Sequence, residues 1–230
     1  MNSKSILDPN FITVINLFNN NNIPYWICHG TLLGIIRDNQ LIEWDHDIDI
    51  AVWSKEVNKE YIISLISKEN FILREGLMIK DDIISFSKDG GRVVDINFYN
   101  KIKLNSDQKE MAYVTWFVPR NIFMKMIEAI SMANKYEGKF KKIVKCFSLI
   151  QKPIFAFKKL LININIFYKE AGYTEPIEFV EKVKKIHFHG LEVKVPLHSK
   201  EYLKYLYGPN WETPKKDYHW YKDGPSTIIR

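Results

Sequence analysis

The hydrophobic pattern begins with a clear helical repeat. A helix is predicted over residues 8–21 because apolar side chains recur there every three or four positions, at Phe11, Val14, Ile15 and Phe18. Asp8 is a suitable N-cap for this helix, and Pro9 suits its first helical position. Pro24 prevents the helix from continuing.

Shorter apolar runs follow and predict a strand, a helix and a second strand. The strand covers 25–28, the short helix runs over 31–37, and the second strand covers 47–53. In residues 47–53 charged and apolar residues alternate, which is typical of a strand with one polar and one buried face. Ser54 is then predicted to cap a helix of about 15 residues.

Three more strands are predicted over 71–79, 83–88 and 92–99, and a further one over 111–118. The turns between the first three fall at Asp81-Asp82 and at Asp89-Gly90-Gly91. An acidic residue followed by two glycines is a strong signal for a hairpin. Strands and helices in this order favour an α+β fold.

The second half of the chain is predicted to be largely helical. We expect a helical region over 121–185 with a break near Pro153, then a strand pair over 188–195 and a short helix over 199–207. The predicted organisation is therefore a core over 1–120, a basic helical subdomain over 121–185, and a tail over 186–230 that completes the domain.

Charge is concentrated in one segment. The chain has a formal net charge of +6, yet residues 135–169 alone hold nine lysines and one acid, Glu137. Two interpretations of this segment remain open, a helical subdomain with a solvated lysine face and an amphipathic element that contacts anionic lipid. Lysine without arginine, and no known binding motif, argue against nucleic acid as a partner.

Cysteine content and hydropathy exclude other classes of protein. Cys28 and Cys146 are too few for a disulfide framework or a zinc site, so both are expected to be reduced thiols. Residues 1–10 lack the apolar core of a signal peptide, and no apolar run is long enough to span a bilayer. We therefore expect a cytoplasmic protein, with peripheral contact at the inner face of the cell membrane if residues 135–169 bind lipid.

Candidate chemistry begins where the first strand meets the short helix. The sequence there is His29-Gly30-Thr31-Leu32-Leu33-Gly34. Backbone N–H groups at a helix start bind phosphate, and the helix dipole adds to the attraction. Gly30 allows close approach of the backbone, and Thr31 adds a hydroxyl.

Three acids alternate shortly afterwards. Asp45, Asp47 and Asp49 lie two residues apart, so a strand places them on one face. Such an array is tolerated when a divalent cation neutralises it, and oxygen ligands suit Mg²⁺ or Mn²⁺. A calcium loop would need a glycine and a Glu at its twelfth position, which this stretch lacks.

A fourth acid lies inside an apolar strand. Asp95 follows Val93 and Val94 and precedes Ile96. A buried aspartate needs a partner or a metal. If this strand lies beside residues 47–53, Asp95 joins the acidic group, either as a metal ligand or as a base; the alternative is a cap or a pair with Arg92.

Taken together, this order resembles the nucleotidyltransferase superfamily, and specifically the LicD and fukutin-related group. The string from Tyr25 through Gly30-Thr31-Leu32-Leu33-Gly34 and Arg37 to Trp44-Asp45-His46-Asp47-Ile48-Asp49 carries the resemblance, which covers 23–100 and, less fully, 186–215. Glu43 departs from the proline that family members often have before this tryptophan.

The resemblance implies a mixed sheet flanked by helices, a bound Mg²⁺ or Mn²⁺, and transfer of a phospho-alcohol from a CDP-linked donor to a hydroxyl of a cell-surface glycan, which can be lipid-linked. Asp47 and Asp49 match the metal-binding pair, with Asp45 and Asp95 as further ligands, and Asp95 also as the base. Substrate contacts are assigned to a second group of residues, Gly30, Thr31, Arg37, His29 and His46.

Two other functions remain open from the sequence. The chain could instead move NMP from an NTP onto a sugar, a protein or a nucleic acid, or it could be a non-catalytic module on the same fold. The four acids argue against the non-catalytic module, because a decayed site would be expected to lose such costly carboxylates. The transferred alcohol is also open: choline, glycerol and ribitol all fit, and Tyr25, Trp26 and Trp44 could form an aromatic cage for a quaternary ammonium or simply pack in the core.

Overall fold

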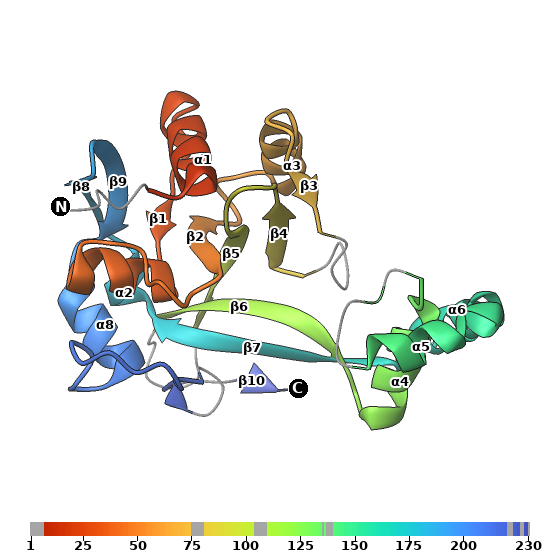
Figure 1. The fold of residues 1–230 in the computed structure, drawn as a ribbon. Coiled ribbons are helices and arrows are strands. Elements are labelled where there is room, and N and C mark those ends of the chain that lie inside the picture. Colours follow the sequence, from red (N-terminus) through yellow and green to blue (C-terminus); the bar gives the residue numbers. More distant parts are fainter. Residues whose placement is uncertain are drawn as a thin grey trace. The chain divides into compact units, whose positions relative to one another are not determined.

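The computed structural model describes residues 7–74, 81–103, 110–134, 136, 140–219, 223–225 and 228–229. The chain divides into two units (Figure 1). The larger unit contains the described residues up to Thr115 together with those from Gly172 to Ile228. The smaller unit contains those from Trp116 to Ala171 and Ile229.

The elements of the first half are α1 (Pro9–Asn20), β1 (Trp26–Ile27), α2 (His29–Asp38), β2 (Asp47–Trp53), α3 (Lys59–Ser67), β3 (Ile72–Leu73), β4 (Ile83–Ser87), β5 (Val93–Lys103) and β6 (Glu110–Pro119). Those of the second half are α4 (Ile122–Ser131), α5 (Lys141–Cys146), η1 (Ser148–Ile150), α6 (Gln151–Asn163), β7 (Tyr168–Pro176), α7 (Ile177–Val180), β8 (Val183–Phe188), β9 (Leu191–Pro196), α8 (Ser199–Tyr207) and β10 (Ile228–Ile229).

The main sheet is mixed. Its strand order is β1-β2-β5-β6-β7-β10, with β4 beside β5 and β3 beside β4. β2 and β5 run parallel, whereas the pairs β1–β2, β3–β4, β4–β5 and β5–β6 are antiparallel. β8 and β9 form a separate two-stranded sheet. The α+β fold with a mixed sheet flanked by helices is thus confirmed.

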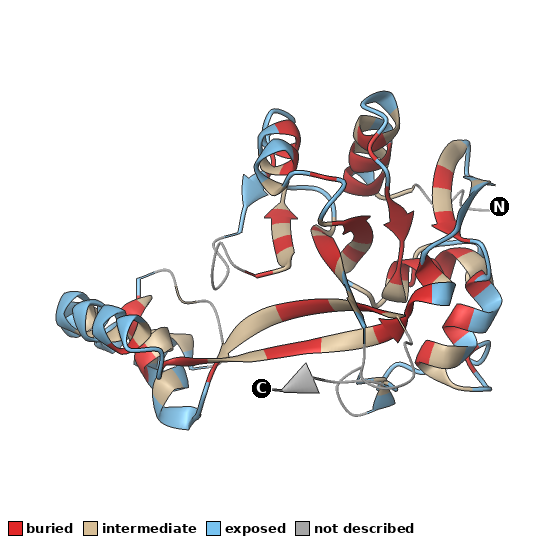
Figure 2. Cartoon of the chain, turned by 180° about the vertical axis from the view of Figure 1, so that it is seen from behind, coloured by how far each residue is buried: buried red, intermediate tan, exposed pale blue. Residues whose placement is uncertain are grey.

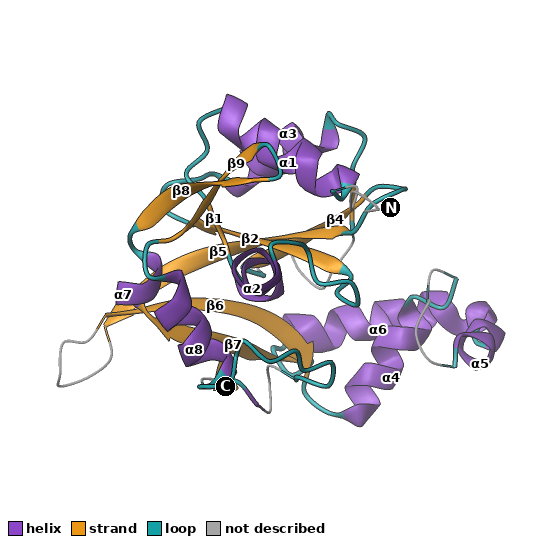
Figure 3. Cartoon of the chain, turned by 60° about the vertical axis from the view of Figure 1, so that its left-hand side comes forward, coloured by secondary structure: helices purple, strands orange, loops and turns teal. Residues whose placement is uncertain are grey.

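Helices cover both faces of the strands β1, β2 and β5. α1 and α3 lie on one face, and α2 lies on the other, packed against α8 (Figure 3). The helical repeat predicted for residues 8–21 is the buried side of α1. Tyr25 and Trp26 are only 2% exposed, so both are core residues, and Trp26 packs against Trp53 and Tyr99. These two aromatics therefore do not form a cage for a ligand.

The start of α1 fastens the hairpin between β4 and β5. Asp8 caps α1 by accepting bonds from the N–H groups of Asn10 and Phe11, and it also accepts from the N–H of Arg92 (3.0 Å). The Asn10 amide donates to the carbonyl oxygens of Lys88 (3.0 Å) and Arg92 (2.8 Å). The turn predicted at Asp89-Gly90-Gly91 is confirmed, and its position is fixed by these bonds.

Two sequence-based expectations were wrong in detail. Ser54 does not cap α3, because its hydroxyl bonds to Asn100; Asn58 is the cap, and its side chain accepts from the N–H of Tyr61. Residues 168–176, placed in the helical region, form β7, which pairs beside β6 in the sheet. The break predicted near Pro153 is present, because α5 ends at Cys146, η1 covers Ser148–Ile150 and a new helix, α6, begins at Gln151 with the proline in its first turn.

Other expectations fall as predicted or lie partly outside the described residues. Of the strand predicted over 71–79, Ile72–Leu73 is seen and residues 75–80 are not described. Cys28 and Cys146 are free thiols, the first buried and the second exposed. Within the described ranges, no helix is both long enough and apolar enough to cross a membrane.

A buried polar cluster lies inside the larger unit. Glu175 Oε2 accepts hydrogen bonds from the hydroxyls of Tyr202 (2.6 Å) and Tyr99 (3.1 Å). The Tyr99 hydroxyl also lies 3.2 Å from that of Tyr173, which lies 2.7 Å from Nε2 of His29. Burial raises the pKa of Glu175 to about 7, while the Tyr202 and Tyr99 bonds lower it. The cluster therefore connects the interior of the unit to the first residue of α2.

Gly34→Ala should destabilise the fold. A Cβ at this position would stand 2.5 Å from the carbonyl oxygen of Gln40 and 3.0 Å from the N of Ile42, so the backbone of the α2–β2 loop would have to move. We expect a loss of about 1–3 kcal/mol in the free energy of unfolding, measured by urea denaturation. Helix propensity alone predicts the opposite sign, so a higher urea midpoint would contradict the tight packing.

Glu175→Gln should change the pH dependence of stability. A carboxyl whose pKa is raised on folding stabilises the fold below about pH 4.5, and this contribution is lost as pH rises toward 7. The variant lacks this loss. As pH rises from 4.5 to 8, the free energy of unfolding of the unaltered chain should therefore fall by about 3 kcal/mol relative to that of the variant. Parallel stability–pH curves for the two proteins would refute the raised pKa.

Candidate functional site

The parallel pairing of β2 with β5 brings three acids to one face of the sheet. Asp49 is the direct neighbour of Asp95 in this register, and Asp47 lies two residues earlier on the same strand. Side chains that neighbour one another across paired strands share a face. The apolar residues between them, Ile48 and Ile50, are fully buried on the opposite face. The strand register thus places Asp95 beside Asp47 and Asp49, as predicted from the sequence.

The start of α2 is fastened to the same point of β2. The N–H of Cys28 donates to the carbonyl oxygen of Asp49 (3.2 Å), and the N–H of Asp49 donates to Thr31 Oγ1 (2.8 Å). Thr31 is 2% exposed. Its hydroxyl oxygen therefore positions the acidic strand, and its proton and second lone pair remain for other contacts. The first turn of α2 lies beside Asp49 because of these two bonds.

Gly30 is needed at the helix start because a carboxylate occupies the space of a side chain. A Cβ at Gly30 would stand 2.3 Å from Oδ2 of Asp45. Asp45 lies just before β2, and its Oδ1 accepts from the N–H of His46 (3.2 Å). Gly30 thus lets the third predicted acid pack directly on the turn that is the candidate phosphate site.

Crowding and burial shift the titration of these acids. Burial raises the pKa of Asp49 well above its usual value, and the charges of Asp47, Asp95 and Asp45 raise it further. Burial also raises the pKa of Asp95, which Ser85 and Arg74 partly offset. The pKa of Asp45 is raised to about 7 by burial and by the Asp47 carboxyl. Like charges therefore meet in a place of low dielectric.

The donor set fits a hard divalent cation. Oδ1 of Asp95 is buried and has no hydrogen-bond partner. Such an oxygen is expected to bind a positively charged group. Carboxylate oxygens are the ligands that Mg²⁺ and Mn²⁺ prefer. Among the described residues, no three acidic, histidine or cysteine side chains are yet gathered closely enough to hold an ion, so these carboxylates would have to draw together around it.

His29 is a neutral, constrained residue at the start of α2. Its backbone has φ = 48°, a left-handed conformation that is unusual for a residue with a side chain. Its Nε2 lies 2.7 Å from the Tyr173 hydroxyl and 3.3 Å from that of Tyr99. Burial lowers the pKa of His29 to about 4, although the charge of Asp47 opposes the shift. The imidazole is therefore uncharged at neutral pH and is held in place by two tyrosines.

Arg37 is engaged elsewhere. Its Nε and one terminal nitrogen bond to the two carboxylate oxygens of Asp38 at 2.8 and 2.7 Å. It also lies in the last turn of α2, whereas Gly30 and Thr31 lie in the first turn. Ten helical residues span roughly 15 Å. Contact between Arg37 and donor phosphates stays a prediction, one that would require this ion pair to open.

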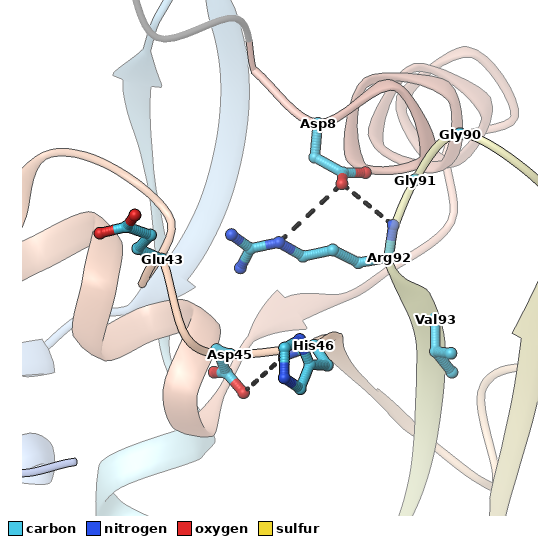
Figure 4. A pocket seen from close by; sticks show the side chains of 8 residues that line it. All are labelled: Asp8, Glu43, Asp45, His46, Gly90, Gly91, Arg92 and Val93. Carbon is cyan, nitrogen blue, oxygen red and sulfur yellow. Dashed lines mark hydrogen bonds and ion pairs between the residues drawn. The ribbon is translucent and has the colours of Figure 1, made fainter.

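A cavity of about 510 Å³ opens beside Asp45 (Figure 4). Its lining residues are Asp8, Glu43, Asp45, His46, Gly90, Gly91, Arg92 and Val93. The exposed His46 is thus on a cavity wall, next to the acidic motif. The Arg92 side chain extends into this space, where its Nε lies 3.9 Å from Oδ2 of Asp8. Arg92 therefore pairs with Asp8, and not with Asp95 as one reading of the sequence allowed.

Sequence reasoning missed several residues that surround the acids. Tyr99 and Tyr173 position His29, and Arg92 brings positive charge to Asp45. Tyr173 is 144 residues from His29, so no local pattern could have connected them. Arg92 was expected only as a possible partner of Asp95, and it lies immediately before β5, the strand that carries this acid.

The chain is similar to a known protein family. Residues 22–143, just over half of the chain, match the family described as LicD/FKTN/FKRP, nucleotidyltransferase domain. No curated protein matches the chain significantly. Among solved structures, the lincomycin-bound lincosamide antibiotic adenylyltransferase LnuA is similar at 12% identity, covering 86% of this chain and 85% of that one with a TM-score of 0.44.

The family match spans α2, β2 and β5, the three elements that carry Gly30, Asp47, Asp49 and Asp95. The chain therefore belongs to the LicD/FKTN/FKRP family of nucleotidyltransferase domains.

Proposed function

We propose that this protein transfers a phospho-alcohol from a CDP-activated donor to a hydroxyl of a glycan, with a divalent cation as cofactor. Family membership supports a phosphotransferase or nucleotidyltransferase activity. The observation that carries the proposal is the placement of the first turn of α2 beside Asp49, itself next to Asp95. The candidate phosphate site in this turn therefore lies beside the carboxylates of Asp49 and Asp95.

Asp47, Asp49 and Asp95 would hold Mg²⁺ or Mn²⁺, with Asp45 as a further ligand. The unpartnered Oδ1 of Asp95 and the mutual repulsion of these acids support this assignment. When bound, the cation would neutralise negative charge on the transferred phosphate and its leaving group.

The start of α2 supplies the other part of the site. Backbone N–H groups in a first helical turn have no partner within the helix, and the helix dipole makes them attractive to a diphosphate. The neutral His29 adds a polar group at this place without adding positive charge, and Tyr173 and Tyr99 fix its orientation. Gly30 and Thr31 keep this turn on β2.

Proton transfer is assigned to Asp95. Asp95 lies directly beside Asp49 in the strand register, and burial raises its pKa, so it is a stronger base than an ordinary aspartate and suited to accept the proton of an attacking hydroxyl. Asp95 is also a candidate metal ligand. Its carboxylate has two oxygens, so one can bind the cation while the other accepts the proton.

The cavity beside Asp45 is assigned to a substrate. It is lined by His46 and Arg92 on the side of the acidic motif, and both groups can bind polar parts of a ligand. Choline, glycerol and ribitol phosphates are all candidate transferred groups.

Product analysis tests the proposal. Purified protein is incubated with Mg²⁺ or Mn²⁺, a candidate glycan acceptor and a panel of CDP-alcohols, and CMP is measured. We expect CMP from one donor and none in the presence of EDTA. If the protein instead incorporates nucleotide from an NTP and releases pyrophosphate, the phospho-alcohol reaction is wrong and the nucleotidyltransferase alternative is correct.

Removal of the carboxylates should stop the reaction. Asp47→Ala and Asp49→Asn are each expected to lower kcat/KM by on the order of 10³-fold or more, because they remove ligands of the charge-neutralising cation. The matched control is Asp89→Asn, which removes an exposed carboxylate from the hairpin turn and should leave the rate unchanged. Comparable rates in all three folded variants would rule out the assigned site.

A further inference from the structure

The smaller unit has its own internal framework. In the centre of this unit the Glu128 carboxylate on α4 accepts from Lys158 Nζ of α6 (3.0 Å) and from the Tyr168 hydroxyl (3.0 Å). Gln151 Nε2 donates to the carbonyl oxygen of Ser131 (3.1 Å). These bonds hold α4 against α6, so the orientation of the outward side chains of both helices is defined.

An unusual number of those outward side chains are apolar. Of the eighteen exposed large apolar residues in the described part of the chain, thirteen lie between Ile122 and Ile166. Leu149 is 93% exposed, Ile122 76% and Phe140 75%. Figure 2 shows this exposure along α4, α5 and α6. Exposed apolar side chains concentrated in one segment are typical of an interaction site.

The exposed residues follow the helical repeat. On α6 and its C-cap, Phe157, Leu160 and Ile164 are spaced by three and four positions and so line one side. Lys152, Phe155 and Lys159 have the same spacing and line a separate side of the helix, where Lys159 Nζ lies 4.9 Å from the centre of the Phe155 ring. The buried Leu161 lies one turn from Phe157 and Ile164, so this exposed apolar stripe borders the buried side of the helix. An amphipathic helix in water would have the opposite distribution, with polar residues outside.

Positive charge accompanies this surface. Between Trp116 and Ala171 the sequence holds eleven Lys or Arg residues and three Glu. Lys142, Lys145 and Lys152 are exposed among the apolar residues of α5, η1 and α6. Of the acids, Glu128 is already engaged by Lys158 and Tyr168. The partner of this surface must therefore be both apolar and negatively charged.

We infer that the α4–α6 surface binds the headgroup region of an anionic lipid bilayer. Exposed Phe, Leu and Ile side chains would enter the boundary between headgroups and acyl chains, while the lysines would contact anionic headgroups. A second copy of this surface is a poor partner, because the two carry the same charge. The inference does not rest on the proposed catalytic function, and its test needs no enzyme activity.

Vesicle co-sedimentation of the full chain tests this inference. Vesicles of phosphatidylcholine alone are compared with vesicles that contain about one third phosphatidylglycerol. We expect binding to the anionic vesicles that weakens as salt is raised, and little binding to the neutral ones. No binding to anionic vesicles, or binding that is equal for the two compositions, would overturn the inference.

Two sets of variants locate the contact. Lys142→Gln, Lys145→Gln and Lys152→Gln together should weaken binding by on the order of a hundredfold. The charge-matched control replaces the exposed Lys182, Lys184 and Lys200 of the larger unit with Gln. It should bind nearly as the unaltered chain does, and an equal loss in both triple variants would overturn the localisation.

The apolar contribution is tested with Ile122→Ser, Leu149→Ser and Leu160→Ser, against Ile72→Ser, which is 71% exposed in the larger unit. We expect the three variants, and not the control, to lose vesicle binding. Sedimentation velocity without lipid tests the alternative occupant of this surface, a second copy of the chain. Reversible dimers that disappear in Leu149→Ser would overturn the lipid assignment in favour of a second copy of the chain.

Discussion

The repulsion between neighbouring carboxylates is the constraint on which the rest of the site depends. The parallel register of β2 and β5 makes Asp49 the direct neighbour of Asp95, and their partial burial weakens the screening of both charges by water. A chain gains nothing in stability from such an arrangement. Its retention is understandable if positive charge from a cation and its ligand completes the site, which is the basis of the proposed function.

The surrounding elements hold this unfavourable group together. Bonds from Cys28 and to Thr31 fasten the start of α2 to Asp49, and Gly30 leaves room for the Asp45 carboxylate. The tyrosines that position His29 also connect to the buried Glu175. The first turn of α2 is thereby kept in a strained conformation beside the acids, as expected where backbone strain serves a binding site.

Much of this could be predicted from the sequence because its signals are local. The helical repeat of α1 and the alternation of β2 follow from side-chain periodicity, and the Asp-Gly-Gly turn follows from backbone preference. The pairing of Asp95 with the motif was predictable only as a condition, that its strand lies beside β2. By contrast, Tyr173 and Glu175 lie in β7, which is a strand because of its neighbours in the sheet and was expected to be helical. Ser54 was misjudged for a similar reason, because its hydroxyl has a distant partner, Asn100.

Calorimetric titration of Mn²⁺ into the protein, with CDP present, tests most directly whether the carboxylates form a cation site. Because the pKa of Asp45 is raised to about 7, cation binding near pH 6 should displace its proton, which appears as a heat that depends on the ionisation enthalpy of the buffer. We predict saturable binding with proton release, and at least about tenfold weaker binding after Asp49→Asn. Absence of Mn²⁺ binding, or binding that Asp49→Asn leaves unchanged, would contradict the assignment of these acids as metal ligands.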